Sequence, residues 1–306
     1  MAFTAKDVAE LRKQTGCGMM DCKNALTEAN GDVEAAIKIL REKGMAAVAK
    51  KASRIAAEGI VDIMTIGDTT AMVEVNSETD FVAKNAVFQE FVKDILKTVI
   101  KNKPQDVDAL MECAFEGQEV GKVSDALAEK TGAIGEKLSI RRFVIIEGAV
   151  ATYIHGAGAT GVIVSFDTDL AGADGFKECS KNVALQVAAM PVQYLNKESV
   201  PASVVEEEKA ILISQMKQDP KMANKPEQVL AKIVEGRIGK FYENNCLVEQ
   251  AYVKDDSLTV GKYVASVAKE LGGNIAVTGF VRFDKGEGIQ KREEDFAAEI
   301  QKMVQG

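Results

Sequence analysis

The chain has 306 residues, of which 46% are hydrophobic and 27% charged, the composition of a soluble globular protein with two or more domains. Its formal net charge of -8 gives a surface that repels phosphate backbones, so we expect no direct contact with nucleic acid. No apolar run approaches the length of about 18 residues that a membrane span requires. The N-terminus has no signal character, because Thr4 and Asp7 are typical of a helix cap, and this predicts a cytoplasmic protein.

The residues that carry most enzyme chemistry are sparse. The five cysteines are scattered, and none has the spacing of a disulfide framework or of a Cys-x-x-Cys metal site. A single histidine, His155, would have to serve any Ser-His-Asp or Cys-His mechanism alone. The chain also lacks the lysine motif of a phosphate-binding loop and the dinucleotide glycine fingerprint. We therefore expect no enzyme activity, no catalytic residue, no metal site and no cofactor.

Residues 1–54 are predicted to form three short helices, over 4–13, 21–29 and 33–43. Asp32 can cap the third helix, and Gly44 is expected to end it. The turn between the first two helices contains Met19 and Met20. Methionine makes adaptable interfaces, so these two residues either contact a partner or pack the small core, and the pattern alone favours neither. Residues 46–57 are predicted to form a helical linker.

An internal repeat follows. Residues 58–81 align with residues 147–170 at a constant offset of 89, without gaps. The identical pairs are Glu58/Glu147, Gly59/Gly148, Val61/Val150, Gly67/Gly156, Val73/Val162, Val75/Val164, Thr79/Thr168 and Asp80/Asp169. Each copy predicts a strand, a glycine turn, a second strand and then a helix, over 82–101 and 176–189. Further strands are expected at 141–146 and 274–283. The core is therefore predicted to be α+β, with two related halves, each a small antiparallel sheet backed by helices.

The two copies differ where the second strand meets the helix. Thr79 and Asp80 recur as Thr168 and Asp169, so their expected role is to cap the following helix. Phe81, in contrast, is Leu170 in the second copy. Seven residues separate Phe81 from Phe88, so helical periodicity alone favours burial of Phe81 in the core.

Two further elements complete the predicted organisation. Residues 200–243 form a helical hairpin that interrupts the second half, and residues 293–303 form a C-terminal helix. The predicted domains are residues 1–54, residues 55–140, residues 141–285 with the hairpin inserted, and a C-terminal module at 286–306. We assign no role to residues 102–130 or 244–258.

The segment Thr79-Asp80-Phe81-Val82 resembles the signature of the bacterial elongation factor Ts family, and the likeness extends to both ends of the chain. The first three helices are similar to the ubiquitin-associated-type domain that opens members of this family. The resemblance implies a guanine-nucleotide exchange factor for the GTPase elongation factor Tu. It also reverses the expectation for Phe81, which would wedge between helices of the partner near its Mg²⁺ site. Asp80 and Val82 would help to hold the distorted state.

An alternative of another class is a ubiquitin-associated-like adaptor that binds other proteins through Met19 and Met20. The sequence leaves open whether copies of the chain form a homo-oligomer. It also leaves open the role of the helical hairpin.

Overall fold

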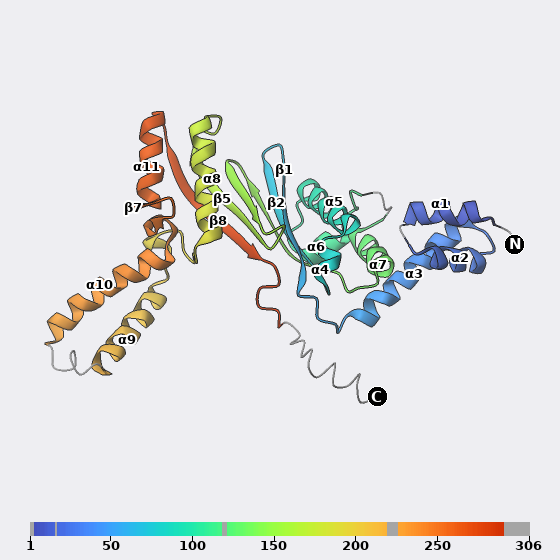
Figure 1. Ribbon diagram of the computed structural model, residues 1–306, viewed down its shortest axis with the longest axis horizontal. Helices are drawn as coiled ribbons and strands as arrows, with labels where there is room; N and C mark the ends of the chain where they lie inside the picture. The colour runs from blue at the N-terminus through green and yellow to red at the C-terminus, as the bar shows by residue number, and fades with distance from the viewer. Residues whose placement is uncertain (1–2, 16, 118–120, 219–225, 291–306) are drawn as a thin grey trace. The chain divides into compact units, whose positions relative to one another are not determined.

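The computed structural model describes residues 3–15, 17–117, 121–218 and 226–290. It is a mixed α+β protein with three N-terminal helices and small sheets, as expected (Figure 1). The chain divides into two compact units. Unit 1 comprises Met1–Ile145, Gly156–Thr160 and Phe283–Gly306, and unit 2 comprises Ile146–His155 and Gly161–Arg282. Over the described part of the chain, no helix is both long and apolar enough to cross a membrane.

Three helices, α1 (Ala5–Thr15), α2 (Met19–Glu28) and α3 (Val33–Lys51), enclose a small apolar core at the start of unit 1. Leu11, Cys22 and Leu26 are fully or almost fully buried there. The Asp32 side chain accepts a hydrogen bond from the Ala35 N–H and caps α3, which confirms the predicted cap.

The third helix is longer than expected. The prediction that Gly44 ends it is wrong, because α3 continues to Lys51. Gly44 is buried, and a Cβ atom at this position would lie 2.8 Å from the carbonyl oxygen of Ala128 in α7 (Val123–Ile134). The absence of a side chain at Gly44 therefore lets two helices approach closely and does not end a helix.

The first sheet has the order β1-β2-β3. Strands β1 and β2 are antiparallel, with Glu58 opposite Ser77 and Ile66 opposite Thr69. The core on this sheet is built largely from fully buried residues of the following helix, including Phe88, Phe91 and Ile95. The elements are β1 (Glu58–Ile66), β2 (Thr69–Ser77), α4 (Asp80–Ala83), α5 (Ala86–Asn102), α6 (Val107–Glu112), α7 and β3 (Ser139–Glu147).

The single helix predicted over 82–101 is in fact two helices, α4 and α5. They are separated at Lys84 and Asn85, and the Asn85 side chain accepts a hydrogen bond of 2.8 Å from the Val87 N–H. Asparagine is a strong N-cap residue, so it begins a new helix here. Burial of Phe81 was predicted from its seven-residue spacing to Phe88 within one helix. Because Phe81 and Phe88 lie in different helices, that spacing no longer places them on one helix face.

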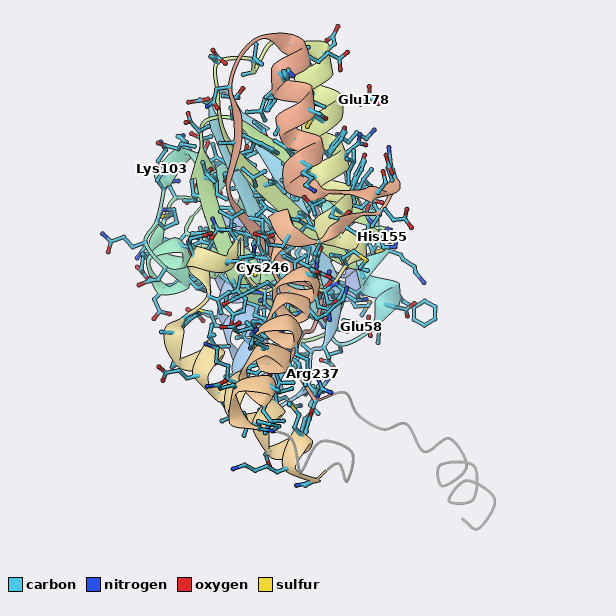
Figure 2. All side chains as sticks on the ribbon, turned by 90° about the vertical axis from the view of Figure 1, so that its left-hand side faces the viewer. Glu58, Lys103, His155, Glu178, Arg237 and Cys246 are labelled. Atoms are coloured by element: carbon cyan, nitrogen blue, oxygen red, sulfur yellow. The ribbon has the colours of Figure 1, made fainter. Side chains whose placement is uncertain are left out.

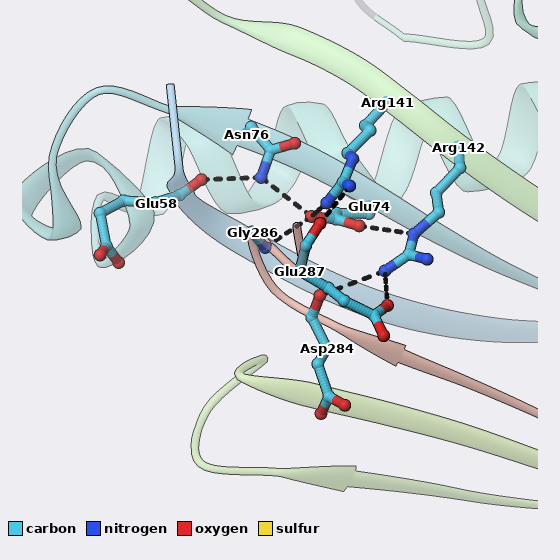
Figure 3. A network of polar contacts seen from close by, with 8 residues as sticks. All are labelled: Glu58, Glu74, Asn76, Arg141, Arg142, Asp284, Gly286 and Glu287. Carbon is cyan, nitrogen blue, oxygen red and sulfur yellow. Dashed lines mark hydrogen bonds and ion pairs between the residues drawn. The ribbon is translucent and has the colours of Figure 1, made fainter. Parts of the chain in front are cut away.

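A buried carboxylate connects β2, β3 and the segment that follows β8 in unit 1 (Figure 3). The Glu74 side chain has no solvent exposure. It accepts hydrogen bonds from Arg142 Nε at 2.7 Å, Arg141 Nη1 at 3.0 Å, Asn76 Nδ2 at 3.0 Å and the Gly286 N–H at 2.8 Å. Burial raises the pKa of Glu74, but these four hydrogen bonds outweigh it and leave the pKa below its ordinary value.

Unit 2 contains the second sheet, of order β4-β5-β8. Helix α8 packs on this sheet and α11 packs against α8. Their apolar core includes Phe176, whose ring meets that of Phe166 edge-on at a centroid distance of 5.3 Å. The elements are β4 (Val150–His155), β5 (Thr160–Thr168), α8 (Asp174–Ala189), η1 (Lys197–Ser199), η2 (Leu247–Glu249), β6 (Ala251–Tyr252), β7 (Asp255–Thr259), α11 (Val260–Leu271) and β8 (Ile275–Asp284).

The expected helical hairpin consists of α9 (Ala202–Gln218) and α10 (Glu227–Asn245). Its two helices pack through Leu212 and Met216 on one side and Val234 and Ile238 on the other. Gln250, which is 2% exposed, donates to the Asn244 carbonyl oxygen at 3.0 Å and so fixes the end of α10. The C-terminal helix predicted at 293–303 lies outside the described residues.

The Glu74 network predicts an acid-sensitive contribution to stability. Because the folded pKa of Glu74 is lowered, this contribution is present above the unfolded value of about 4.3 and is lost as pH falls through the folded pKa. At neutral pH, Glu74→Gln should lower the free energy of unfolding by roughly 1.5–3 kcal/mol, the value of hydrogen bonds to a charged group.

Urea titrations from pH 7 to pH 3 would check this prediction. The difference between the variant and the wild type should shrink at the acid end. The control is Glu28→Gln, since the Glu28 side chain is 58% exposed and should matter little at any pH. A constant difference across the whole pH range would contradict the account.

Candidate functional site

The candidate site is the first corner, residues 79–82, where β2 leads into α4. Thr79 is the N-cap of α4, and its hydroxyl oxygen accepts the Val82 N–H at 3.5 Å. The Ser77 hydroxyl donates to the Thr79 carbonyl oxygen at 2.9 Å. The predicted cap is therefore present, and hydrogen bonds on both sides of Thr79 fix the direction of the turn.

Phe81 lies on the outer side of this turn. Its side chain is 80% exposed, whereas Val82 and the neighbouring Ala83 are 8% and 6% exposed and belong to the core of unit 1. The prediction from periodicity that Phe81 packs in the core is therefore wrong. Val82 is an apolar anchor beneath the turn, and Phe81 is an aromatic ring held in solvent by a short, anchored helix.

Asp80 is next to this ring and is half exposed. Its carboxylate lies 2.6 Å from Lys84 Nζ, one helical turn away, and the side-chain hydrogen bond from Lys84 lowers the pKa of Asp80. Asp80 is therefore an anion at neutral pH, and its partner Lys84 is 73% exposed. The first corner thus presents a negative group and an apolar ring side by side.

The second corner, residues 168–171, has the same Thr-Asp pair but uses it differently. The Thr168 hydroxyl donates to the Asn274 carbonyl oxygen at 2.7 Å, and Asp169 accepts the Asn274 N–H at 2.8 Å. Leu170 is partly buried against the core of unit 2, and a Cβ atom at Gly273 would lie 2.7 Å from Leu170 Cγ. Both polar side chains therefore bind the backbone of Asn274, and the apolar one packs against the core of unit 2, so the second corner has no exposed ring comparable to Phe81.

Met19 and Met20 begin α2 and do not lie in a loop. They are 54% and 61% exposed, so the alternative that both pack the small core is wrong. They form an exposed apolar pair on the N-terminal helices and remain candidates for a partner contact.

The groups that could support nucleophilic chemistry are poorly placed for it. His155 is exposed at the end of β4, where its Nδ1 lies 3.1 Å from the Tyr153 hydroxyl (Figure 2). Burial raises the pKa of the Cys17 and Cys179 thiols to about 11, which keeps them protonated at neutral pH. These features do not form the nucleophile and base pair of a hydrolase.

Sequence reasoning missed the residues that hold the first corner from outside. Glu136 and Lys137, in the loop after α7, bond to Thr79 and Glu78. These partners are almost 60 residues apart in the sequence, and no local pattern links them. A local signal is Gly135, which ends α7 with a positive φ of 84° directly before these two residues.

Comparison with known proteins identifies the family. A sequence model described as elongation factor TS matches residues 78–287. The elongation factor Ts of Syntrophotalea carbinolica is 46% identical over 307 residues, which cover 99% of this chain and 100% of that protein. The elongation factor Ts of Clostridium kluyveri is 45% identical over 309 residues, covering 99% of each chain. That of Magnetococcus marinus is 45% identical over 310 residues, covering 100% of each chain. The chain belongs to the elongation factor Ts family.

Proposed function

We propose that the first corner is the part of this chain that releases GDP from elongation factor Tu, and that it does so by disturbing the Mg²⁺ site of the GTPase. Elongation factor Ts is a non-catalytic protein of translation elongation. It is the nucleotide exchange factor for elongation factor Tu. Membership in the family therefore confirms the expected exchange function, partner and cytoplasmic location, and it sets aside the adaptor alternative. The assignment of individual residues is the proposal.

The exposure of Phe81 is the observation that carries this proposal. Burying a phenylalanine side chain stabilises a complex by about 1.5–3 kcal/mol, and each tenfold in rate requires about 1.4 kcal/mol. A ring that is 80% exposed before binding keeps nearly all of that free energy for the partner. If it is realised only in the exchange-competent state, Phe81 alone supplies roughly 10- to 100-fold in GDP release.

The chemistry of Mg²⁺ explains why a small wedge is sufficient. Mg²⁺ requires near-ideal octahedral geometry, so a modest displacement of the loops around it weakens its binding. Loss of the cation leaves the β-phosphate of GDP without its main counter-charge. In the proposal, Phe81 separates partner helices, Asp80 adds a negative group close to them, and Thr79 and Val82 keep the turn rigid.

The N-terminal helices are proposed as a second contact with the partner. Residues 1–54 form a ubiquitin-associated-like module, and Met19 and Met20 are its contact residues. Their exposure and their position at the start of one helix support this role. The four-part domain division predicted from the sequence, with two repeated halves, likewise remains a proposal.

Phe81→Ala should slow the stimulated release of labelled GDP by roughly ten-fold or more, because the burial free energy of the ring is lost. The melting temperature should stay near that of the wild type, since the ring leaves no core cavity. The matched control is Leu170→Ala, which should lower stability while the folded fraction exchanges normally. If Phe81→Ala melts several degrees early yet releases GDP at the normal rate, the assignment fails.

The Met19→Ala, Met20→Ala double variant should weaken binding to elongation factor Tu by about ten-fold or more, since two apolar side chains lose their burial. Met45→Ala is the control, because Met45 is 60% exposed on the same three helices but is not part of the pair. Titration calorimetry with the GTPase measures both. Equal affinities for the two variants would remove these methionines from the interface.

A further inference from the structure

The first corner is held by a clasp of side chains from three parts of unit 1. We use the name corner clasp for Arg54, Glu78, Thr79, Glu136 and Lys137. One half of it is Glu136, whose carboxylate accepts the Thr79 N–H at 2.9 Å and the Thr79 hydroxyl at 2.7 Å. Hydrogen bonds to an ionised acceptor are roughly twice as strong as neutral ones. Both donors of Thr79 thus point to one carboxylate.

This arrangement determines how Thr79 acts as a cap. A threonine hydroxyl has one proton and two acceptor lone pairs. Because the Thr79 hydroxyl donates its hydrogen bond to Glu136, the lone pairs of the hydroxyl oxygen remain free to accept the Val82 N–H that begins α4. Glu136 therefore fixes the rotamer of the cap and, through it, the direction in which Phe81 leaves the turn.

The other half of the corner clasp extends to the end of the N-terminal helices. Glu78 accepts the Lys137 N–H at 2.5 Å and ion-pairs with Arg54 at 3.2 Å. Lys137 Nζ in turn donates to the carbonyl oxygens of Ala52 at 2.7 Å and Arg54 at 2.8 Å. The segment after α3, the loop after α7 and the residue before the cap are consequently tied together.

The second corner shows what Glu136 replaces. There the acceptor for the Thr168 hydroxyl is the backbone carbonyl oxygen of Asn274 at 2.7 Å, and Leu170 lies against Gly273. In the first corner the Glu136 carboxylate accepts the hydroxyl and the N–H of Thr79, while Asp80 pairs with the exposed Lys84 and Phe81 is 80% exposed. We infer that Glu136 is a positioning residue for nucleotide exchange, which acts on the partner only through the orientation of Phe81. This inference rests on the proposed function of the first corner.

The test is a double-mutant cycle between Glu136→Ala and Phe81→Ala. The measured quantities are the maximal rate constant of GDP release at saturating chain, the half-saturating concentration, and the melting temperature. In the wild-type background, Glu136→Ala should lower the maximal rate by roughly three- to ten-fold, less than Phe81→Ala does, because the ring is kept and only its orientation is less fixed. The half-saturating concentration should change by less than about two-fold, because the rest of the interface is intact.

In the Phe81→Ala background, the same Glu136→Ala change should have no further effect on the maximal rate. Glu136→Gln keeps an acceptor for the Thr79 hydroxyl, so its maximal rate should lie between those of Glu136→Ala and the wild type. It replaces Glu136→Ala in the cycle if that variant folds poorly. Glu112→Gln is the control, because the Glu112 side chain is 66% exposed and bonds Lys122, away from the corner clasp.

Two results would overturn the inference and leave the proposed function standing. One is a slow Phe81→Ala variant with Glu136→Ala at the normal rate. The other is an equal slowing by Glu136→Ala in both backgrounds, which would mean that Glu136 acts through general stability or another contact. A normal rate for Phe81→Ala itself would instead overturn the proposed function, and the inference with it.

Discussion

The carboxylate of Glu74 is the constraint on which unit 1 depends most directly. A charged group without solvent contact requires donors around it, and its donors come from β2, β3 and the segment after β8 (Figure 3). Arg142 makes two further contacts. It donates to the Asp284 carbonyl oxygen at 3.1 Å, and its guanidinium lies 4.1 Å from the centre of the Phe283 ring. Segments distant in the sequence thus share one satisfied polar centre. Since β2 runs from this centre to Ser77, the position of the first corner follows from it.

The first corner also shows how an exposed aromatic ring can be kept out of a core. Phe81 is excluded because Val82 and Ala83 occupy the apolar surface beneath α4, while Thr79 is held by Glu136. The free energy that burial of Phe81 would provide is therefore left for a partner. By thermodynamic linkage this effect is reciprocal. The factor by which the exchange factor weakens GDP binding to the GTPase equals the factor by which GDP weakens binding of the exchange factor. A factor that works by such a wedge must bind and leave with each cycle, so a rigid preformed corner serves it better than one that folds on binding.

Much of the fold could be predicted because its signals are local. The caps at Thr79 and Asp32, the repeat of two strand pairs and the helical hairpin all follow from residue types at short spacing. The predictions that are wrong concern competing signals. Gly44 has the local pattern of a helix end, yet α7 packs against it, and Asn85 breaks a helix that periodicity alone would continue.

The site could be predicted only in part, for the same reason. The difference between Phe81 and Leu170 is visible in the repeat, but the exposure of Phe81 follows from the helix break at Asn85, which the periodicity does not indicate. Glu136 and Lys137 lie in a stretch without periodicity, and their partners are brought close only by the folded sheet. Contacts of this kind carry no signal in a single sequence. The polar support of the first corner therefore became apparent only from the structure.

The central claim is that the ring at position 81 moves from solvent into the GTPase. The chain contains no tryptophan, so Phe81→Trp labelled with 5-fluorotryptophan gives a single ¹⁹F resonance at the corner. We expect this resonance to shift and to lose its sensitivity to a soluble paramagnetic quencher when nucleotide-free elongation factor Tu is added. A resonance that remains as accessible to the quencher in the complex as in the free chain would contradict the account.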